Sequence, residues 1–202
     1  MKNRILLLCG GLALVIISAA AWWIQPEGKK KLAVPERVCR STFSGTQVEP
    51  LLHGGKGKVQ SNIERGFPGS RRTSSGPVCE LSAEGKSVSF RIEYPSFHPE
   101  LRKLEQERKH VATMGPAYGS YNESNGTISL DIVCPTRGNP ESSLFVNVGA
   151  SMVREGEKES LAKLADLTGY AARTLAQDVY KCKGADELPE GPVSIRRGEG
   201  SR

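Results

Sequence analysis

The sequence has few aromatic residues and few histidines, and it lacks the short motifs that mark most catalytic and metal sites. Aromatic residues make up 6% of the 202 residues, and there are three histidines. No histidine lies in an H-x-x-x-H or H-E-x-x-H pattern, and no G-x-S-x-G stretch is present. The stretch HGGKGK lacks the first glycine of a phosphate-binding P-loop. The sequence therefore predicts no cofactor, no metal site and no catalytic residue that can be named.

Positive charge is in excess, with a net charge of +6 and a pI near 9.1. Most of the excess lies between residues 29 and 72. No arginines alternate with aromatic residues and no zinc-finger spacing occurs, so we expect no nucleic-acid partner. A candidate basic contact surface, for an envelope protein or another anionic ligand, comprises Lys56, Lys58, Arg65, Arg71 and Arg72. The alternative is a loop whose charges are only solvated.

There is only one long hydrophobic run, residues 5–24, which carries no charge. As a helix it would extend about 30 Å, the thickness of the hydrocarbon core of a bilayer. Two cationic residues precede it, and two tryptophans lie at its end, where indoles favour the headgroup layer. Residues 1–24 are therefore predicted to be a single-pass signal anchor that contacts membrane lipid. The alternative is a signal peptide, cleaved at the small residues 18–21, and a secreted protein.

Five cysteines are present, and one of them, Cys9, lies inside the hydrophobic run. Only residues 5–8 of the run precede it, which is too few for a signal peptide cleaved at this cysteine, and Leu8 is too large for the position before a lipid-modified cysteine. The others are Cys39, Cys79, Cys134 and Cys182. Their spacing is too wide for a zinc site and includes no C-x-x-C redox motif. An even number behind an export-like segment favours two disulfides in an oxidising compartment over four buried thiols.

The lysines at 29–31 outnumber the cations before the run, and the positive-inside rule would keep the domain in the cytoplasm. The cysteines favour the opposite orientation, and large domains translocate largely regardless of charge. Of the three connectivities we favour Cys39–Cys79 and Cys134–Cys182, because Cys182 continues the apolar stripe of the last helix and would face the sheet. The sequence leaves the other two pairings open.

Alternating hydrophobic residues predict two strand pairs, and a helical repeat predicts a long C-terminal helix. The pairs comprise residues 78–83 with 87–94, around a turn at 84–86, and residues 126–135 with 142–150. The helix covers 157–181. We therefore expect an α+β domain in which an antiparallel sheet of four or more strands packs one face against this helix.

The remaining segments carry weaker patterns. We expect a short helix at 46–52, a basic loop at 56–75, a helix at 98–114 that begins around Pro99, and a loop at 115–126. Sequons at Asn122 and Asn125 indicate that the last loop is exposed. The predicted division is an anchor at 1–24, a charged linker at 25–37, a domain at 38–183 and a polar tail at 184–202.

The sequence resembles small membrane-anchored or lipoprotein-type extracytoplasmic domains of actinobacteria. The resemblance rests on the single span, VPERVC, VCEL, the strand-end CP and the helix LAKLADLTGYAARTLAQDVYKC. The resemblance covers residues 35–183 and departs from lipoprotein members at Leu8, where they have a small residue. It implies a disulfide-bonded α+β domain outside the membrane and no known activity.

We expect a non-catalytic binding or structural role at the cell surface. The alternatives are a cell-envelope enzyme, such as a hydrolase whose site at His98 or His110 forms only in the fold, and a redox partner with an exposed disulfide.

Overall fold

The computed structural model describes residues 32–68, 76–93, 100–136, 139–151, 153 and 158–201. The predicted anchor at 1–24 and most of the linker lie outside these residues. Among the residues that are described, no helix is long and apolar enough to cross a membrane. One compact unit begins at Leu32 and continues to the C-terminus.

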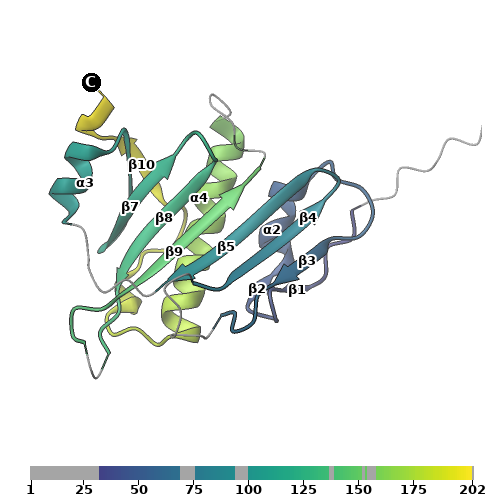
Figure 1. Ribbon diagram of the computed structural model, residues 1–202, viewed down its shortest axis with the longest axis horizontal. Helices are drawn as coiled ribbons and strands as arrows, with labels where there is room; N and C mark the ends of the chain where they lie inside the picture. The colour runs from purple at the N-terminus through teal and green to yellow at the C-terminus, as the bar shows by residue number, and fades with distance from the viewer. Residues whose placement is uncertain are drawn as a thin grey trace, which may run out of the picture. The chain divides into compact units, whose positions relative to one another are not determined.

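An eight-stranded antiparallel sheet forms the frame of this unit (Figure 1), which confirms the α+β prediction. Its strands lie in the order β10-β6-β7-β8-β9-β5-β4-β3. Their bounds are β3 Gln60–Ile63, β4 Val78–Ala83, β5 Lys86–Glu93, β6 His110–Met114, β7 Ala117–Asn122, β8 Thr127–Val133, β9 Ser143–Ala150 and β10 Ser194–Arg197. A separate ribbon pairs β1 (Arg37–Val38) with β2 (Phe43–Ser44).

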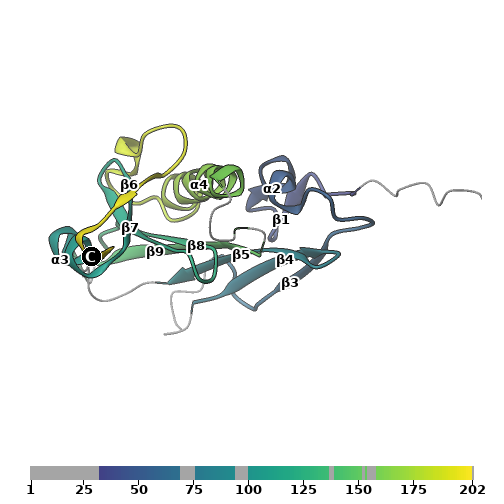
Figure 2. The same cartoon turned by 90° about the horizontal axis from the view of Figure 1, so that it is seen from above.

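Helices α2 (Gly45–Leu52) and α4 (Lys158–Arg173) lie on the same side of the sheet, as Figure 2 shows. The predicted C-terminal helix is thus confirmed, but its last part, η1 (Thr174–Val179), is π-helical. A third helix, α3 (Leu101–Glu107), packs against β6, β7 and the short 3₁₀ turn η3 (Glu199–Ser201). Helices α2 and α4 thus cover only one face of the central strands.

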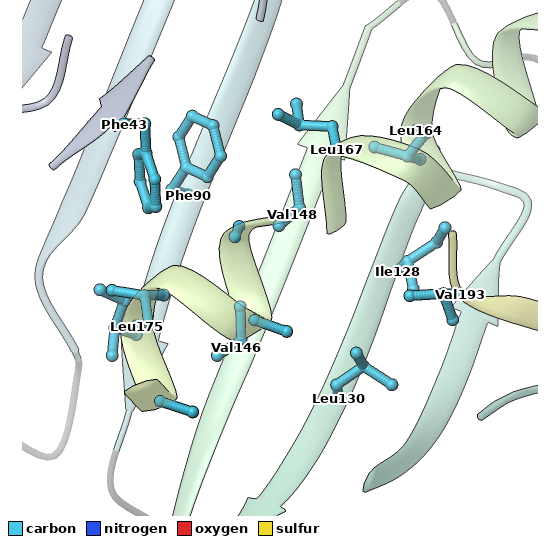
Figure 3. Close-up of a cluster of buried hydrophobic side chains, with 14 of the residues drawn as sticks. Phe43, Phe90, Ile128, Leu130, Val146, Val148, Leu164, Leu167, Leu175 and Val193 are labelled. Carbon is cyan, nitrogen blue, oxygen red and sulfur yellow. The ribbon is translucent and has the colours of Figure 1, made fainter. Parts of the chain in front are cut away.

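The core fills the space between the sheet and helices α2 and α4 (Figure 3). On β5 the side chains of Val88, Phe90 and Ile92 are buried, and the residues between them point to the other face. The ring of Phe43 stacks on Phe90 with centroids 4.3 Å apart. Such alternation is what a sheet with one buried face requires, and the hairpin of β4 and β5 forms as the sequence predicted.

Both disulfides have the connectivity favoured from the sequence. Cys39 is bonded to Cys79 on β4, and Cys134, which follows β8, is bonded to Cys182 beyond the C-terminal helix. All four cysteines are buried. The first bond fixes the β1–β2 ribbon to the sheet, and the second joins the end of the helical layer to the sheet.

The helix predicted to continue to Met114 ends at Glu107, and this prediction was wrong in its second half. Arg108 is extended, with φ −109° and ψ 138°, and residues 110–114 form β6. Val111 and Thr113 are β-branched, which favours a strand, and β6 pairs with β7 on one side and β10 on the other. Pairing with distant strands outweighs the weak helical spacing here.

The segment 115–126, predicted to be a loop, contains strand β7. Its small and polar residues gave no hydrophobic alternation. Gly119 is needed there, because a Cβ at this position would lie 2.0 Å from the Ser129 carbonyl oxygen on β8. Neighbouring strands, rather than local propensity, therefore determine this strand.

The predicted tail and the predicted basic loop also contribute strands. Within 184–202, β10 pairs with β6, and turn η2 (Ala185–Glu187) precedes it. Within 56–75, β3 pairs with β4 at the opposite edge. Ala33, inside the predicted linker, forms a β-bridge with Lys58.

Candidate functional site

The face of the sheet opposite α2 and α4, here called the outer face, is the candidate site. No described helix covers it over β9, β5 and β4 (Figure 2). Its side chains alternate with the core residues along each strand and are mostly hydroxyls and amides. They include Ser120 and Asn122 on β7, Thr127 and Ser129 on β8, Phe145 and Asn147 on β9, Ser89 and Arg91 on β5, and Glu80 on β4.

Two adjoining hollows of about 580 and 470 Å³ lie on this face. The larger extends over β7 and β8 toward the end of α3, and the smaller extends over β9, β5 and β4. Asn125, Thr127 and Asn147 line both hollows. The two hollows therefore share a wall and form one groove across the strands.

One row of side chains crosses the groove. Ser120, Ser129, Asn147 and Arg91 are successive Cα partners on β7, β8, β9 and β5. The hydroxyls of Ser120 and Ser129 lie 3.3 Å apart. Within the described chain no hydrogen bond engages the Asn147 amide, which lines both hollows. That amide offers a donor and an acceptor to a ligand.

The turn between β7 and β8 forms the rim that the two hollows share. The Asn122 side-chain oxygen accepts hydrogen bonds from the Ser124 hydroxyl at 2.7 Å and from its backbone N–H at 3.0 Å. The Asn125 oxygen accepts from the Thr127 hydroxyl at 2.7 Å. Both asparagines are exposed, as the sequons indicated. These local bonds hold the rim side chains in fixed positions.

A cluster of charges lies at the outer end of the larger hollow. Lys109 Nζ donates to Glu123 Oε2 at 3.0 Å, and His110 Nε2 contacts the other oxygen of the same carboxylate. The hydrogen bond from Lys109, with the charges of His110 and Lys109, lowers the pKa of Glu123. In the smaller hollow, the guanidinium nitrogen Nη1 of Arg91 lies 3.7 Å from Oε1 of Glu93. Lys109, His110 and Arg91 thus each have a carboxylate close by.

The groove lacks the contacts of a nucleophilic site among the residues that are described. Of the four serines that line it, Ser120, Ser124 and Ser129 bond to each other, to Asn122 or to backbone. The Ser89 hydroxyl has no partner among the described residues, and none of the four is found to bond to His110. No described group of three or more His, Cys, Asp or Glu residues could hold a metal ion. The arrangement suits recognition of a polar ligand through hydrogen bonds.

A buried carboxylate, Asp131, lies on the outer face beside the groove, opposite Phe145 on β9. Asp131 accepts a hydrogen bond from the Ser143 hydroxyl at 3.3 Å and is paired across the strands with Tyr118. Burial, then the charges of Asp131 and Glu100, raise the pKa of Tyr118. Tyr118 is therefore harder to ionise than an exposed tyrosine.

The basic contact surface predicted from the sequence lies away from the groove. Lys56 and Lys58 are exposed before β3, Arg65 is exposed after it, and none of them lines a hollow. Arg71, Arg72 and His98 lie outside the described residues. Its role as a contact surface for an anionic ligand or an envelope protein stays a prediction.

Sequence reasoning missed Asn125, Thr127 and Asn147. The signal that could have found Thr127 and Asn147 is the polar set of alternate positions on the predicted strands 126–135 and 142–150, whereas Asn125 is marked only as a sequon.

No family model, no curated protein and no solved structure matches the chain.

Proposed function

We propose that this protein is a membrane-anchored, extracytoplasmic binding module that contacts its ligand through the groove on the outer face of the sheet. The observation that carries the proposal is the pair of adjoining hollows, lined by side chains whose hydrogen-bonding groups point away from the core. Hollows of several hundred cubic ångströms with a few convergent polar groups are typical of binding sites. The proposed role is non-catalytic.

Two features support a location outside the membrane with an anchor in it. Two disulfides close a domain of modest size, which is typical of oxidising compartments. The uncharged residues 5–24 precede the folded unit and are long enough to span a bilayer as a helix. In this proposal the N-terminal segment binds membrane lipid and keeps the groove at the cell surface.

The second candidate, a cell-envelope enzyme, rests on the pairing of His110 with Glu123 beside the larger hollow. A carboxylate that orients a histidine is half of a general-base arrangement. None of the serines lining the groove is found to bond to His110, so the nucleophile would have to be a ligand hydroxyl or water. The binding role needs no such additional group and is the better supported of the two.

The test compares two arginine variants on the same face. Full-length protein, solubilised in detergent, is mixed with sedimented cell envelope from the source organism after deletion of the gene. The fraction of the protein that sediments with the envelope is measured. Asn147→Arg places a long charged side chain in both hollows, and we expect it to abolish binding. Asn62→Arg, on the exposed outer side of β3 and outside both hollows, should bind like the unmodified protein.

Equal binding by the two variants would contradict the groove as the contact surface. Location is tested separately with a membrane-impermeant thiol reagent on intact cells. Labelling of the four domain cysteines on intact cells after reduction supports the extracytoplasmic proposal, whereas labelling only after the cells are lysed would overturn it.

A further inference from the structure

We infer that the ligand of the groove is an uncharged polysaccharide strand. The inference rests on the proposed function and names the chemistry of its ligand. It depends on three properties of the groove: the kind of hydrogen-bonding group it presents, the balance of its charges, and an aromatic ring in its floor.

The central strands that form the floor of the groove present side-chain hydroxyls and amides rather than free backbone. Strands β8, β9 and β5 each pair with a neighbour on both sides, so their backbone N–H and C=O groups are used within the sheet. A peptide that added as a further strand would need an edge, and the edges of the sheet are β10 and β3. Recognition across the groove must therefore use groups such as Ser89, Ser129 and Asn147.

Hydroxyl and amide groups both donate and accept hydrogen bonds. A sugar ring carries hydroxyls that also do both, all around its edge. The Asn147 amide and the Ser89 hydroxyl have no hydrogen-bond partner among the described residues, so they are available without breaking an existing contact. A polyhydroxylated ligand satisfies such a surface better than a ligand with acceptors only.

The charges lining the groove cancel. The lining contains three permanent cations, Arg91, Arg108 and Lys109, and an equal number of carboxylates, Glu80, Glu107 and Glu123. His110, which contacts Glu123, adds a charge only when it is protonated. The pair of Lys109 with Glu123 is already formed. A polyanion, such as a nucleic acid or a sulfated glycan, needs a net positive surface. The balance favours a neutral ligand, unlike the basic segment around β3.

Phe145 supplies an apolar plane in the smaller hollow, next to Asn147 on β9. Its side chain is half-buried, although it points away from the core side of the sheet. Aromatic rings at binding sites contribute a large rigid apolar area, and the C–H face of a sugar ring is the part of a neutral glycan that packs on such an area. The smaller hollow thus combines one apolar plane with polar groups around it.

The continuity of the hollows indicates a strand of several sugar units. Each hollow falls within the range of about 300–1,000 Å³ typical of small-ligand sites. They share Asn125, Thr127 and Asn147, so a chain that leaves one hollow enters the other. A single sugar would occupy only part of the groove.

The test uses full-length protein in a polyoxyethylene detergent, because detergents with sugar headgroups would compete. It is applied to an array of neutral glycans and a matched set of sulfated ones, and hits are measured by titration calorimetry with tetrasaccharides. We expect binding to at least one neutral tetrasaccharide that strengthens with chain length. Asn147→Ala and Phe145→Ala should each weaken it by about tenfold, and Asn62→Ala should leave it unchanged.

Near-unchanged thermal unfolding of the three variants establishes that any loss is local. Failure of every neutral glycan, or binding only to the sulfated set, overturns the polysaccharide inference. The proposed function has a separate readout, because the envelope-binding difference between Asn147→Arg and Asn62→Arg requires no glycan. If the two variants still differ, protease treatment of the envelope abolishes binding and no neutral glycan binds, then the binding role stands and the ligand is a protein.

Discussion

Cys134, just beyond the end of β8, is bonded to Cys182, just beyond the π-helical end of the C-terminal helix. The bond joins the two layers of the domain across a sequence separation of 48 residues. On the chain-entropy model, closing a loop of this size stabilises the folded state by about 4 kcal/mol.

Removal of this disulfide by the double substitution Cys134→Ala and Cys182→Ala is therefore expected to lower the free energy of unfolding by about 4 kcal/mol. Urea denaturation followed by circular dichroism measures the change. The matched pair is Cys39→Ala with Cys79→Ala, whose separation of 40 residues predicts a similar loss. A loss well below 1 kcal/mol in both would show that the disulfides do not stabilise the domain.

Phe90→Ala should cost about 3–5 kcal/mol, because it removes a fully buried ring stacked on Phe43 and leaves a cavity. Phe145→Ala makes the same chemical change on the other face of the sheet, where the ring is half-buried, and should cost far less. Thermal and urea unfolding of both variants checks the contrast. Equal losses would contradict the assignment of the two faces.

Glu123 links pH to stability through its lowered pKa. Its contribution is present above about pH 4.3, the pKa of an unfolded glutamate, and is lost as the pH falls through the lower folded value. Glu123→Gln should therefore reduce stability at pH 7, by up to about 1 kcal/mol for a partly exposed pair, and make no difference near pH 2. Urea midpoints across this range measure it.

The control for that titration is Glu159→Gln, which breaks an exposed pair with Lys163 one helical turn away. It should change the midpoint little at any pH. A Glu123 effect that grows as the pH falls would have the wrong sign for a carboxylate with a lowered pKa.

Truncation after Gly191 should destabilise the domain, although the sequence alone marks this region as a tail. It removes β10 and the buried Val193, whose backbone N–H donates to the Ala165 carbonyl on α4. The loss of Val193 burial alone is worth about 1.5–3 kcal/mol, and the exposed edge of β6 favours aggregation. Thermal unfolding and light scattering measure both effects.

Arg197→Ser is the control for the truncation, because it changes an exposed side chain and keeps the strand. It should stay within about 0.5 kcal/mol of the unmodified protein. If the truncated chain were as stable as this variant, β10 would contribute nothing to the sheet.

Much of the sheet could be predicted from the sequence, for a physical reason that particular strands show. β5, β8 and β9 lie in the middle of the sheet with one face buried, so Phe90, Leu130 and Val146 must alternate with polar residues. The apolar stripe of α4 follows from the same requirement. Where burial imposes a strong pattern, the pattern can be read locally.

The missed strands lack that pattern because their partners, rather than their own side chains, hold them. β7 has Gly119 where β8 comes close, and β3 and β10 are short edges with mostly exposed side chains. The groove was missed for a related reason. Asn147 lines the same hollows as Thr127 and Asn125 because of the register in which β8 pairs with β9. Spacing along the sequence does not reveal that register.

Strand β10 completes one edge of the sheet by pairing with β6, which is made some eighty residues earlier. Until β10 has been made, the edge of β6 has no partner there, and Cys134 must wait for Cys182. The order of synthesis therefore keeps both the sheet edge and the second disulfide open until residues 182–197 are available. The folded unit closes late, and its two long-range closures depend on the same short stretch of chain.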